Sequence, residues 1–191
     1  KEDRFFALLE ASAEEARHSV QAMVKLSKAA GQPGSLEEFA ASRRADKKIT
    51  QEISEALTTT FVTSIEREDI EALSNALYKI PKTVEKFGER LNLAPEQVQG
   101  VDFSRQTALI ELAVETLVTM VRSLRQPDLE QVKSLNARLQ QLEGDADKAV
   151  LDLLRDVYQG RHPAHKSLLL KDLYELLERV IDRCRDAGNV V

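Results

Sequence analysis

Apolar residues recur every three or four positions along most of this 191-residue chain, in long stretches that few glycines and prolines interrupt. This spacing places apolar side chains on one face of an α-helix, whereas a half-buried strand would show strict alternation. The chain contains only 7 Gly and 5 Pro, so few positions force a helix to stop. We therefore predict an all-α fold of long amphipathic helices.

The interruptions predict six long helices. Gly31 and Pro33 end the first helix, Gln126 and Pro127 end the fourth, and Gly160 ends the fifth. Ser35 and Thr63 are each followed by a glutamate three residues later, which predicts a capping box at the start of the second and third helices. The expected helices cover residues 3–30, 35–61, 63–91, 103–125, 128–158 and 165–187, and one short turn is expected at 95–98.

A linker at residues 93–102, which holds Pro95 and Gly100, divides the chain into two units, 1–92 and 103–191. Short connections between long helices make neighbouring helices antiparallel, so each unit is expected to form a three-helix bundle. Residues 44–47 and 145–148 are similar, as are 68–70 and 171–173, at offsets of about 101 to 103 positions. We interpret this similarity as an internal duplication of a three-helix unit.

Charge composition excludes some classes of partner. The 27 basic and 32 acidic residues are interleaved and give a net charge of -5, so no basic face is prepared for the phosphates of DNA or RNA. The single cysteine, Cys184, excludes an intramolecular disulfide, and no apolar run approaches the ~20 residues that span a bilayer. No apolar signal-peptide stretch follows the basic and acidic start. These features predict a cytoplasmic protein.

Two pairs of carboxylates have a spacing that suits a metal site. Glu143 and Asp147 lie four residues apart on the fifth expected helix, and Glu178 and Asp182 lie four apart on the sixth, so each pair shares one helix face. Converging oxygen ligands are what a hard or borderline cation requires. In the alternative interpretation both pairs are solvated surface charge, balanced by Lys148, Arg179 and Arg183.

A basic stripe follows one face of the third expected helix. Its members Lys79, Lys82, Lys86 and Arg90 are spaced by three, four and four residues. Such a stripe suits an acidic partner, phosphate or the anionic surface of a membrane. In the alternative interpretation it is a solvated face that pairs with Glu85 and Glu89.

Three segments resemble the PhoU-like family, specifically the branch of Pit accessory proteins also known as DUF47. Residues 60–70 resemble the family's junction between the second and third helices, with Ser64 where a proline is usual. Residues 142–147 and 174–182 resemble its acidic motifs in the fifth and sixth helices. The resemblance covers nearly the whole chain. It implies paired three-helix bundles, a metal cluster on each bundle, no catalysis, and a regulatory role beside a phosphate transporter.

The first unit departs from the family pattern. The offset alignment places Ser42, Asp46, Asn75 and Lys79 where the second unit has its four carboxylates, and Lys82 lies one turn further on. An ammonium group at Lys79 repels a cation beside Asp46. We therefore expect one metal site, holding Fe, Zn, Ni or Mn, and we expect it only in the second unit.

These observations predict a non-enzymatic regulator of phosphate transport that acts by protein contact. By the family resemblance its partner is a Pit-type permease, which the protein meets at the inner face of the membrane. Long helices rich in Leu and Val favour a homo-oligomer, most simply a dimer. Two alternatives remain open: an oligomeric helical scaffold without a metal, and a hydrolase in which carboxylate-bound metal activates water.

Overall fold

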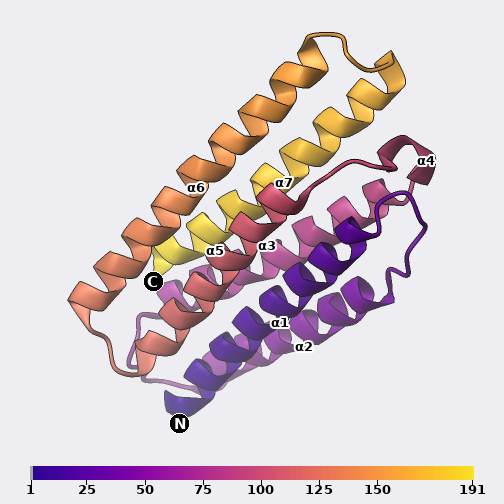
Figure 1. The fold of residues 1–191 in the computed structure, drawn as a ribbon. Coiled ribbons are helices and arrows are strands. Elements are labelled where there is room, and N and C mark those ends of the chain that lie inside the picture. Colours follow the sequence, from indigo (N-terminus) through magenta and orange to yellow (C-terminus); the bar gives the residue numbers. More distant parts are fainter. Residues whose placement is uncertain (1) are drawn as a thin grey trace.

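The computed structural model describes residues 2–191 and contains helices but no strand over that range. Figure 1 shows an elongated bundle in which the long helices run antiparallel to their chain neighbours. The predicted all-α fold is confirmed. The elements are α1 (Glu2–Lys28), α2 (Glu37–Thr59), α3 (Arg67–Leu91), α4 (Pro95–Val98), α5 (Ser104–Arg122), the 3-10 turn η1 (Ser123–Arg125), α6 (Leu129–Tyr158) and α7 (Ala164–Val190).

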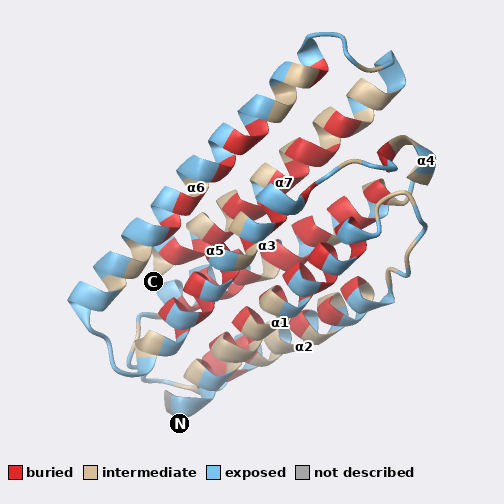
Figure 2. Cartoon of the chain, viewed as in Figure 1, coloured by how far each residue is buried: buried red, intermediate tan, exposed pale blue. Residues whose placement is uncertain are grey.

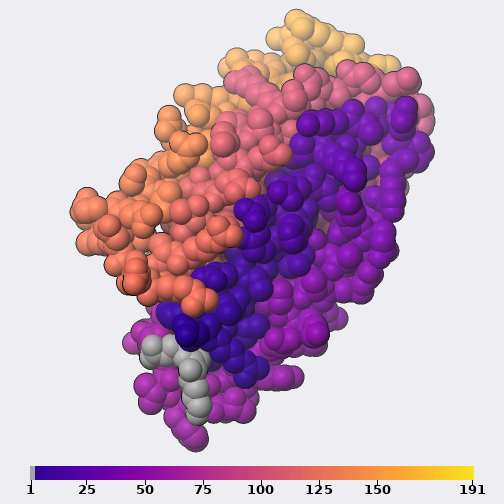
Figure 3. All heavy atoms as spheres, turned by 60° about the horizontal axis from the view of Figure 1, so that its bottom comes forward, coloured from indigo at the N-terminus to yellow at the C-terminus, as the bar shows by residue number. Residues whose placement is uncertain are grey.

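The helices form two groups of three. α1, α2 and α3 contact one another, and α6 and α7 pack together with α5. The groups meet through α1 against α5 and α3 against α7, so α2 and α6 lie at opposite edges. Figure 3 shows one broad face, on which α2, α1, α5 and α6 follow in that order.

One apolar core runs through both groups. Buried positions line the inner faces of all six long helices, and exposed positions face outward (Figure 2). Phe103 lies where the groups meet, because its ring packs edge-on against Phe87 of α3 at 5.7 Å between centroids and against Tyr174 of α7 at 5.9 Å. A ring shared in this way couples the two groups energetically.

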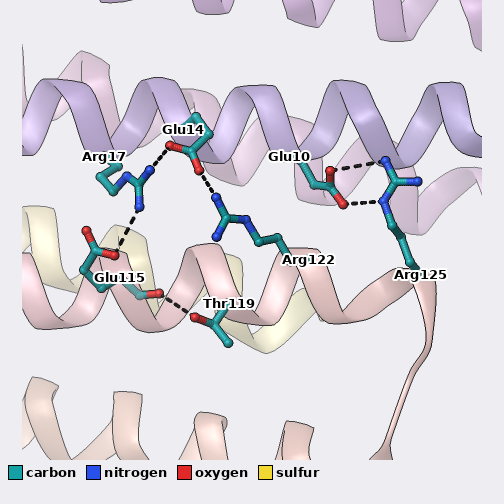
Figure 4. A network of polar contacts seen from close by, with 7 residues as sticks. All are labelled: Glu10, Glu14, Arg17, Glu115, Thr119, Arg122 and Arg125. Atoms are coloured by element: carbon teal, nitrogen blue, oxygen red, sulfur yellow. Dashed lines mark hydrogen bonds and ion pairs between the residues drawn. The ribbon is translucent and has the colours of Figure 1, made fainter.

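Ion pairs reinforce the contact between α1 and α5 (Figure 4). Arg122 of α5 donates to Glu14 of α1 at 2.5 Å. Arg17, also on α1, pairs with Glu14 of its own helix and with Glu115 of α5. Arg125 donates from η1 to Glu10 at 2.6 Å. Because these side chains are partly exposed, the pairs add little to stability, and their main effect is to fix how the helices align.

Two predicted capping boxes are wrong. Ser35 Oγ accepts a hydrogen bond from the Glu37 amide at 3.2 Å, but α2 begins after Leu36 without a side-chain cap. Thr63 donates its hydroxyl to the carbonyl of Ile65 at 2.6 Å instead of capping α3. Neither hydroxyl therefore forms the predicted bond to the residue three positions later, because a backbone group two residues away takes it instead.

The burial pattern places the internal duplication at an offset of 100 residues. Ile70, Leu73, Leu77, Ile80 and Val84 of α3 are buried, and so is the residue 100 positions later in α7 in every case. In α2 and α6 the same offset pairs the buried residues 39 with 139, 42 with 142, 46 with 146 and 57 with 157. The alignment at 101 to 103 is therefore wrong by one to three positions.

Candidate metal centre on α6 and α7

The four predicted carboxylates lie beside the contact between α6 and α7. On α6, Glu143 follows the buried Leu142 directly, and Asp147 follows the buried Ala146. On α7, Glu178 and Asp182 follow the buried Leu177 and Ile181 in the same way. Glu143, Glu178 and Asp182 are therefore held half-buried at the border of the packed face, while Asp147 is exposed.

Electrostatics shows that the four groups share one environment. Burial and the nearby charges of Glu143 and Asp147 raise the pKa of Asp182 to about 6. Burial also raises the pKa of Glu178, helped by the charges of Asp147 and Asp182 and by a hydrogen bond with Asp147. The pKa of Glu143 is raised mainly by burial, although the charge of Arg185 opposes the shift. Negative charge on neighbouring carboxylates thus contributes to the raised pKa values of Glu143, Glu178 and Asp182, and a cation would offset this repulsion.

The donor set fits a metal ion in its chemistry. Carboxylate oxygens bind Fe, Mn and other hard or borderline cations. Within residues 2–191, however, no three His, Cys, Asp or Glu side chains are close enough to hold one ion together. The backbone thus brings the four residues to the contact between α6 and α7, while their side chains do not converge on a single point.

The offset of 100 changes which residues correspond to these carboxylates in the first unit. Glu143 and Asp147 correspond to Arg43 and Lys47 of α2, not to Ser42 and Asp46. By the same offset, Glu178 and Asp182 correspond to Tyr78 and Lys82 of α3, not to Asn75 and Lys79. Three of the four acidic positions therefore carry basic residues in the first unit.

The exchange of acidic for basic residues between the two units also includes positions 85 and 185. In the second unit the charge of Arg185 acts on Glu143, and in the first unit Arg43 Nη1 donates to Glu85 Oε1 at 2.8 Å. Residues 85 and 185 are again 100 positions apart, so acid and base have exchanged helices. We name Arg43, Lys47, Tyr78, Lys79 and Lys82 the α2–α3 basic cluster.

Only part of the predicted basic stripe is free of ion pairs with other residues that the structure describes. Lys79, Lys82 and Lys86 are exposed and make no ion pair with the part of the chain that the structure describes. Arg90 differs, because it donates to Asp172 of α7 at 2.5 Å. The expected alternative partner Glu85 is engaged by Arg43. The fourth member of the stripe thus joins the two groups of helices.

Asp46, which the sequence alignment placed at a ligand position, is a core residue. It is 0% exposed and corresponds to Ala146 in the second unit. Its Oδ1 accepts from Ser12 Oγ at 2.7 Å, while its Oδ2 is buried without a partner. Burial raises the pKa of Asp46 to about 6; the Ser12 hydrogen bond opposes the shift and the charge of Glu15 adds to it.

Comparison with solved structures identifies the fold. A PhoU-like protein from Shewanella oneidensis MR-1 superposes with a TM-score of 0.75 over 97% of this chain and 96% of that one, at 16% identity. A second protein from the same organism, described as a candidate PhoU-like phosphate regulatory protein, gives a TM-score of 0.74 over the same shares at 17% identity. The chain has the PhoU-like fold. The expected two three-helix units correspond to the two groups of helices in the structure.

Sequence comparison gives a further likeness, over part of the chain. The UPF0111 protein YkaA of Bacillus subtilis is 25% identical over 130 residues, which are 68% of this chain and 63% of that protein. The match thus spans less than two thirds of the length of that relative. No model of a known protein family matches the chain. None of the described helices is both long and apolar enough to cross a bilayer.

Proposed function

We propose that this PhoU-like chain is an accessory protein in the regulation of phosphate transport, and that it acts by binding rather than by turnover. The proposal rests on the fold, which extends over 97% of the chain and is shared with a protein described as a candidate phosphate regulator. Its partner is a Pit-type permease, met at the cytoplasmic side of the membrane, and the regulator works as a homodimer. Long rigid helices suit this role because they present extended surfaces.

The observation that carries a metal-binding role is the mutual repulsion of the carboxylates on α6 and α7. Three of the four have a raised pKa, and neighbouring carboxylates contribute to each shift. We propose that a divalent or trivalent ion such as Fe, Zn, Ni or Mn offsets that repulsion, and that binding it draws the side chains of Glu143, Asp147, Glu178 and Asp182 together as its ligands, because these side chains do not converge on one point in the structure. We propose one such site per chain, because Arg43, Lys47 and Lys82 repel a cation at the corresponding place in the first unit.

A hydrolase using the same metal is the weaker candidate. Water activation at a carboxylate-bound metal requires a substrate pocket beside the ligands. The larger grooves described in the structure, of about 410 to 640 Å³, lie along α1–α2, along α1–α5, at η1 and at the start of α7. None of these grooves is lined by Glu143 or Asp182.

Metal content of the purified protein tests the metal role. We expect stoichiometric metal in the wild type by mass spectrometry, and its loss in Glu143→Gln/Asp182→Asn. The matched control is Glu71→Gln/Asp145→Asn, which removes the same charge from two exposed positions and is expected to keep the metal. If neither the wild type nor either variant binds metal after incubation with Fe, Zn, Ni and Mn, the carboxylates are surface charge, and the alternative of a helical scaffold without a metal gains support.

The regulatory role has a separate test in cells. Deleting the gene is expected to change the rate of phosphate uptake through the permease, and the wild-type chain is expected to restore it. Unchanged uptake after deletion, measured at both low and high external phosphate, would exclude the proposed role whatever the metal content.

A further inference from the structure

The two units carry opposite charge at structurally matched positions. The contact between α6 and α7 is bordered by Glu143, Asp147 and Asp182, and the residues 100 positions earlier in α2 and α3 are Arg43, Lys47 and Lys82. Since the buried positions of α3 and α7 also match at this offset, the helices hold these side chains in equivalent places. A backbone that directs four acidic residues to the α6–α7 contact therefore directs three basic residues and a tyrosine to the α2–α3 contact.

Most of the positive charge in the α2–α3 basic cluster lacks an internal counter-charge. Arg43 pairs with Glu85 at 2.8 Å. Lys47, Lys79 and Lys82 are exposed and form no ion pair with any of residues 2–191. The three ammonium groups thus repel one another, and a multivalent anion would offset this repulsion better than a single carboxylate.

Tyr78 supplies a directed donor within the cluster. Arg43 Nη2 donates to the Tyr78 hydroxyl oxygen at 3.0 Å, and the guanidinium also lies 5.4 Å from the centre of the ring. Because that oxygen accepts from arginine, its own hydrogen is free to donate to a third group. A partly buried hydroxyl held by arginine, on the same helix as Lys79 and Lys82, suits an oxyanion.

We propose that the α2–α3 basic cluster binds a phosphate group. Lys47, Lys79 and Lys82 supply charge, Tyr78 donates a hydrogen bond, and Arg43 orients Tyr78. The phosphate comes either from free inorganic phosphate or from an anionic lipid headgroup, which have the same recognition chemistry. This inference stands independently of whether α6 and α7 bind a metal.

Calorimetric titration of the full chain with inorganic phosphate, at constant ionic strength set by chloride, tests the free-ligand source. Flotation with phosphatidylcholine vesicles containing phosphatidic acid tests the lipid source. In either arm we expect Lys47→Gln/Lys82→Gln to weaken binding about tenfold or more, since it removes two charge-assisted contacts. Tyr78→Phe is expected to weaken it by a smaller factor, about threefold to tenfold, through loss of one hydrogen bond.

The matched control is Lys28→Gln/Lys148→Gln, which changes the net charge equally at exposed positions outside the cluster. Binding to phosphate or to vesicles that falls in the cluster variant and persists in the control supports the proposal and names the source. Equal weakening in both double variants would mean non-specific attraction and would overturn it. Absence of binding in both arms would also overturn it, and neither result bears on the metal content of α6 and α7.

Discussion

At the scale of single residues, Asp46 is a core position where burying the side chain costs the first unit more free energy than the second. The second unit has Ala146 at the equivalent core position, whereas Asp46 buries a carboxylate with one hydrogen bond and one unpartnered oxygen. A buried charge without a full set of partners favours its protonated form, which is why the pKa of Asp46 rises to about 6. At this core position the first unit thus carries a pH-dependent group that the second unit replaces with an alanine.

We predict that Asp46→Asn reduces the pH dependence of stability. The pKa of Asp46 in the folded state lies above the ordinary value of 3.8, so the folded state takes up a proton first and gains stability as the pH falls through about 6. Between pH 7.5 and 5.0 this gain is about 1 kcal/mol. Urea unfolding at both pH values measures it as the difference between wild type and variant.

Other carboxylates with raised pKa values, those of Glu143, Glu178 and Asp182, contribute to the wild-type slope in the same direction. Their contribution remains in Asp46→Asn and cancels in the comparison. A variant whose slope equals that of the wild type would show that burial of Asp46 does not perturb its ionisation.

At the scale of elements, a glycine sets how closely the outer helix of each unit packs. Gly88 of α3 and Gly188 of α7 are equivalent positions. A Cβ at Gly88 would lie 3.0 Å from Phe39 Cε2, and one at Gly188 would lie 2.5 Å from Leu139 Cδ2. Residues 39 and 139 are equivalent too, so the same close contact is built twice from different side chains.

We predict that Gly188→Ala destabilises the protein by about 1 to 2 kcal/mol, because displacing the buried Leu139 costs more than the helix propensity that alanine adds. Gly144→Ala is the control: Gly144 lies within α6, and a Cβ there would meet nothing within 4 Å. That variant is expected to gain up to about 1 kcal/mol. Thermal and urea unfolding of both measure the contrast, and a stabilised Gly188→Ala would mean that α6 moves away at little cost.

The helices themselves could be predicted from the sequence, while their caps could not. Apolar periodicity with Gly and Pro interruptions located all six long helices, and even the short α4. The expected end at Gly188 was wrong, because α7 continues to Val190. The caps at Ser35 and Thr63 were wrong because a loop hydroxyl has several backbone partners within reach, and sequence spacing does not decide among them.

The candidate site could likewise be predicted from the sequence only in part. Spacing of four residues placed each acidic pair on one face, and the structure brings both pairs to the contact between α6 and α7, where their charges act on one another. The first unit was misaligned because Ala-Asp-Lys occurs in both repeats with a shift of one residue. One residue is about 100° around a helix, so the shift exchanged the buried Asp46 for the exposed Lys47. Only the burial pattern reveals the charge inversion.

At the scale of the whole molecule, the two groups of helices share one core instead of each closing its own. Phe103, which is 1% exposed, touches rings from both groups, and Arg90 of α3 pairs with Asp172 of α7. If the two groups were separated, the inner faces of α1, α3, α5 and α7 would be exposed to water. A ligand bound in one unit is therefore able to change the stability of the other.

We predict that Phe103→Ala lowers the free energy of unfolding by about 3 to 5 kcal/mol and that the whole chain still unfolds in a single transition. The large loss follows from an empty space between Phe87 and Tyr174, and the single transition follows from the shared core. Urea unfolding followed by far-ultraviolet circular dichroism and by tyrosine fluorescence tests both, because coincident curves indicate one cooperative unit.

Phe61→Ala, at a side chain that is 98% exposed, is the control and should change stability by less than about 0.5 kcal/mol. Two separate transitions in Phe103→Ala would instead mean that each three-helix group is stable without the other.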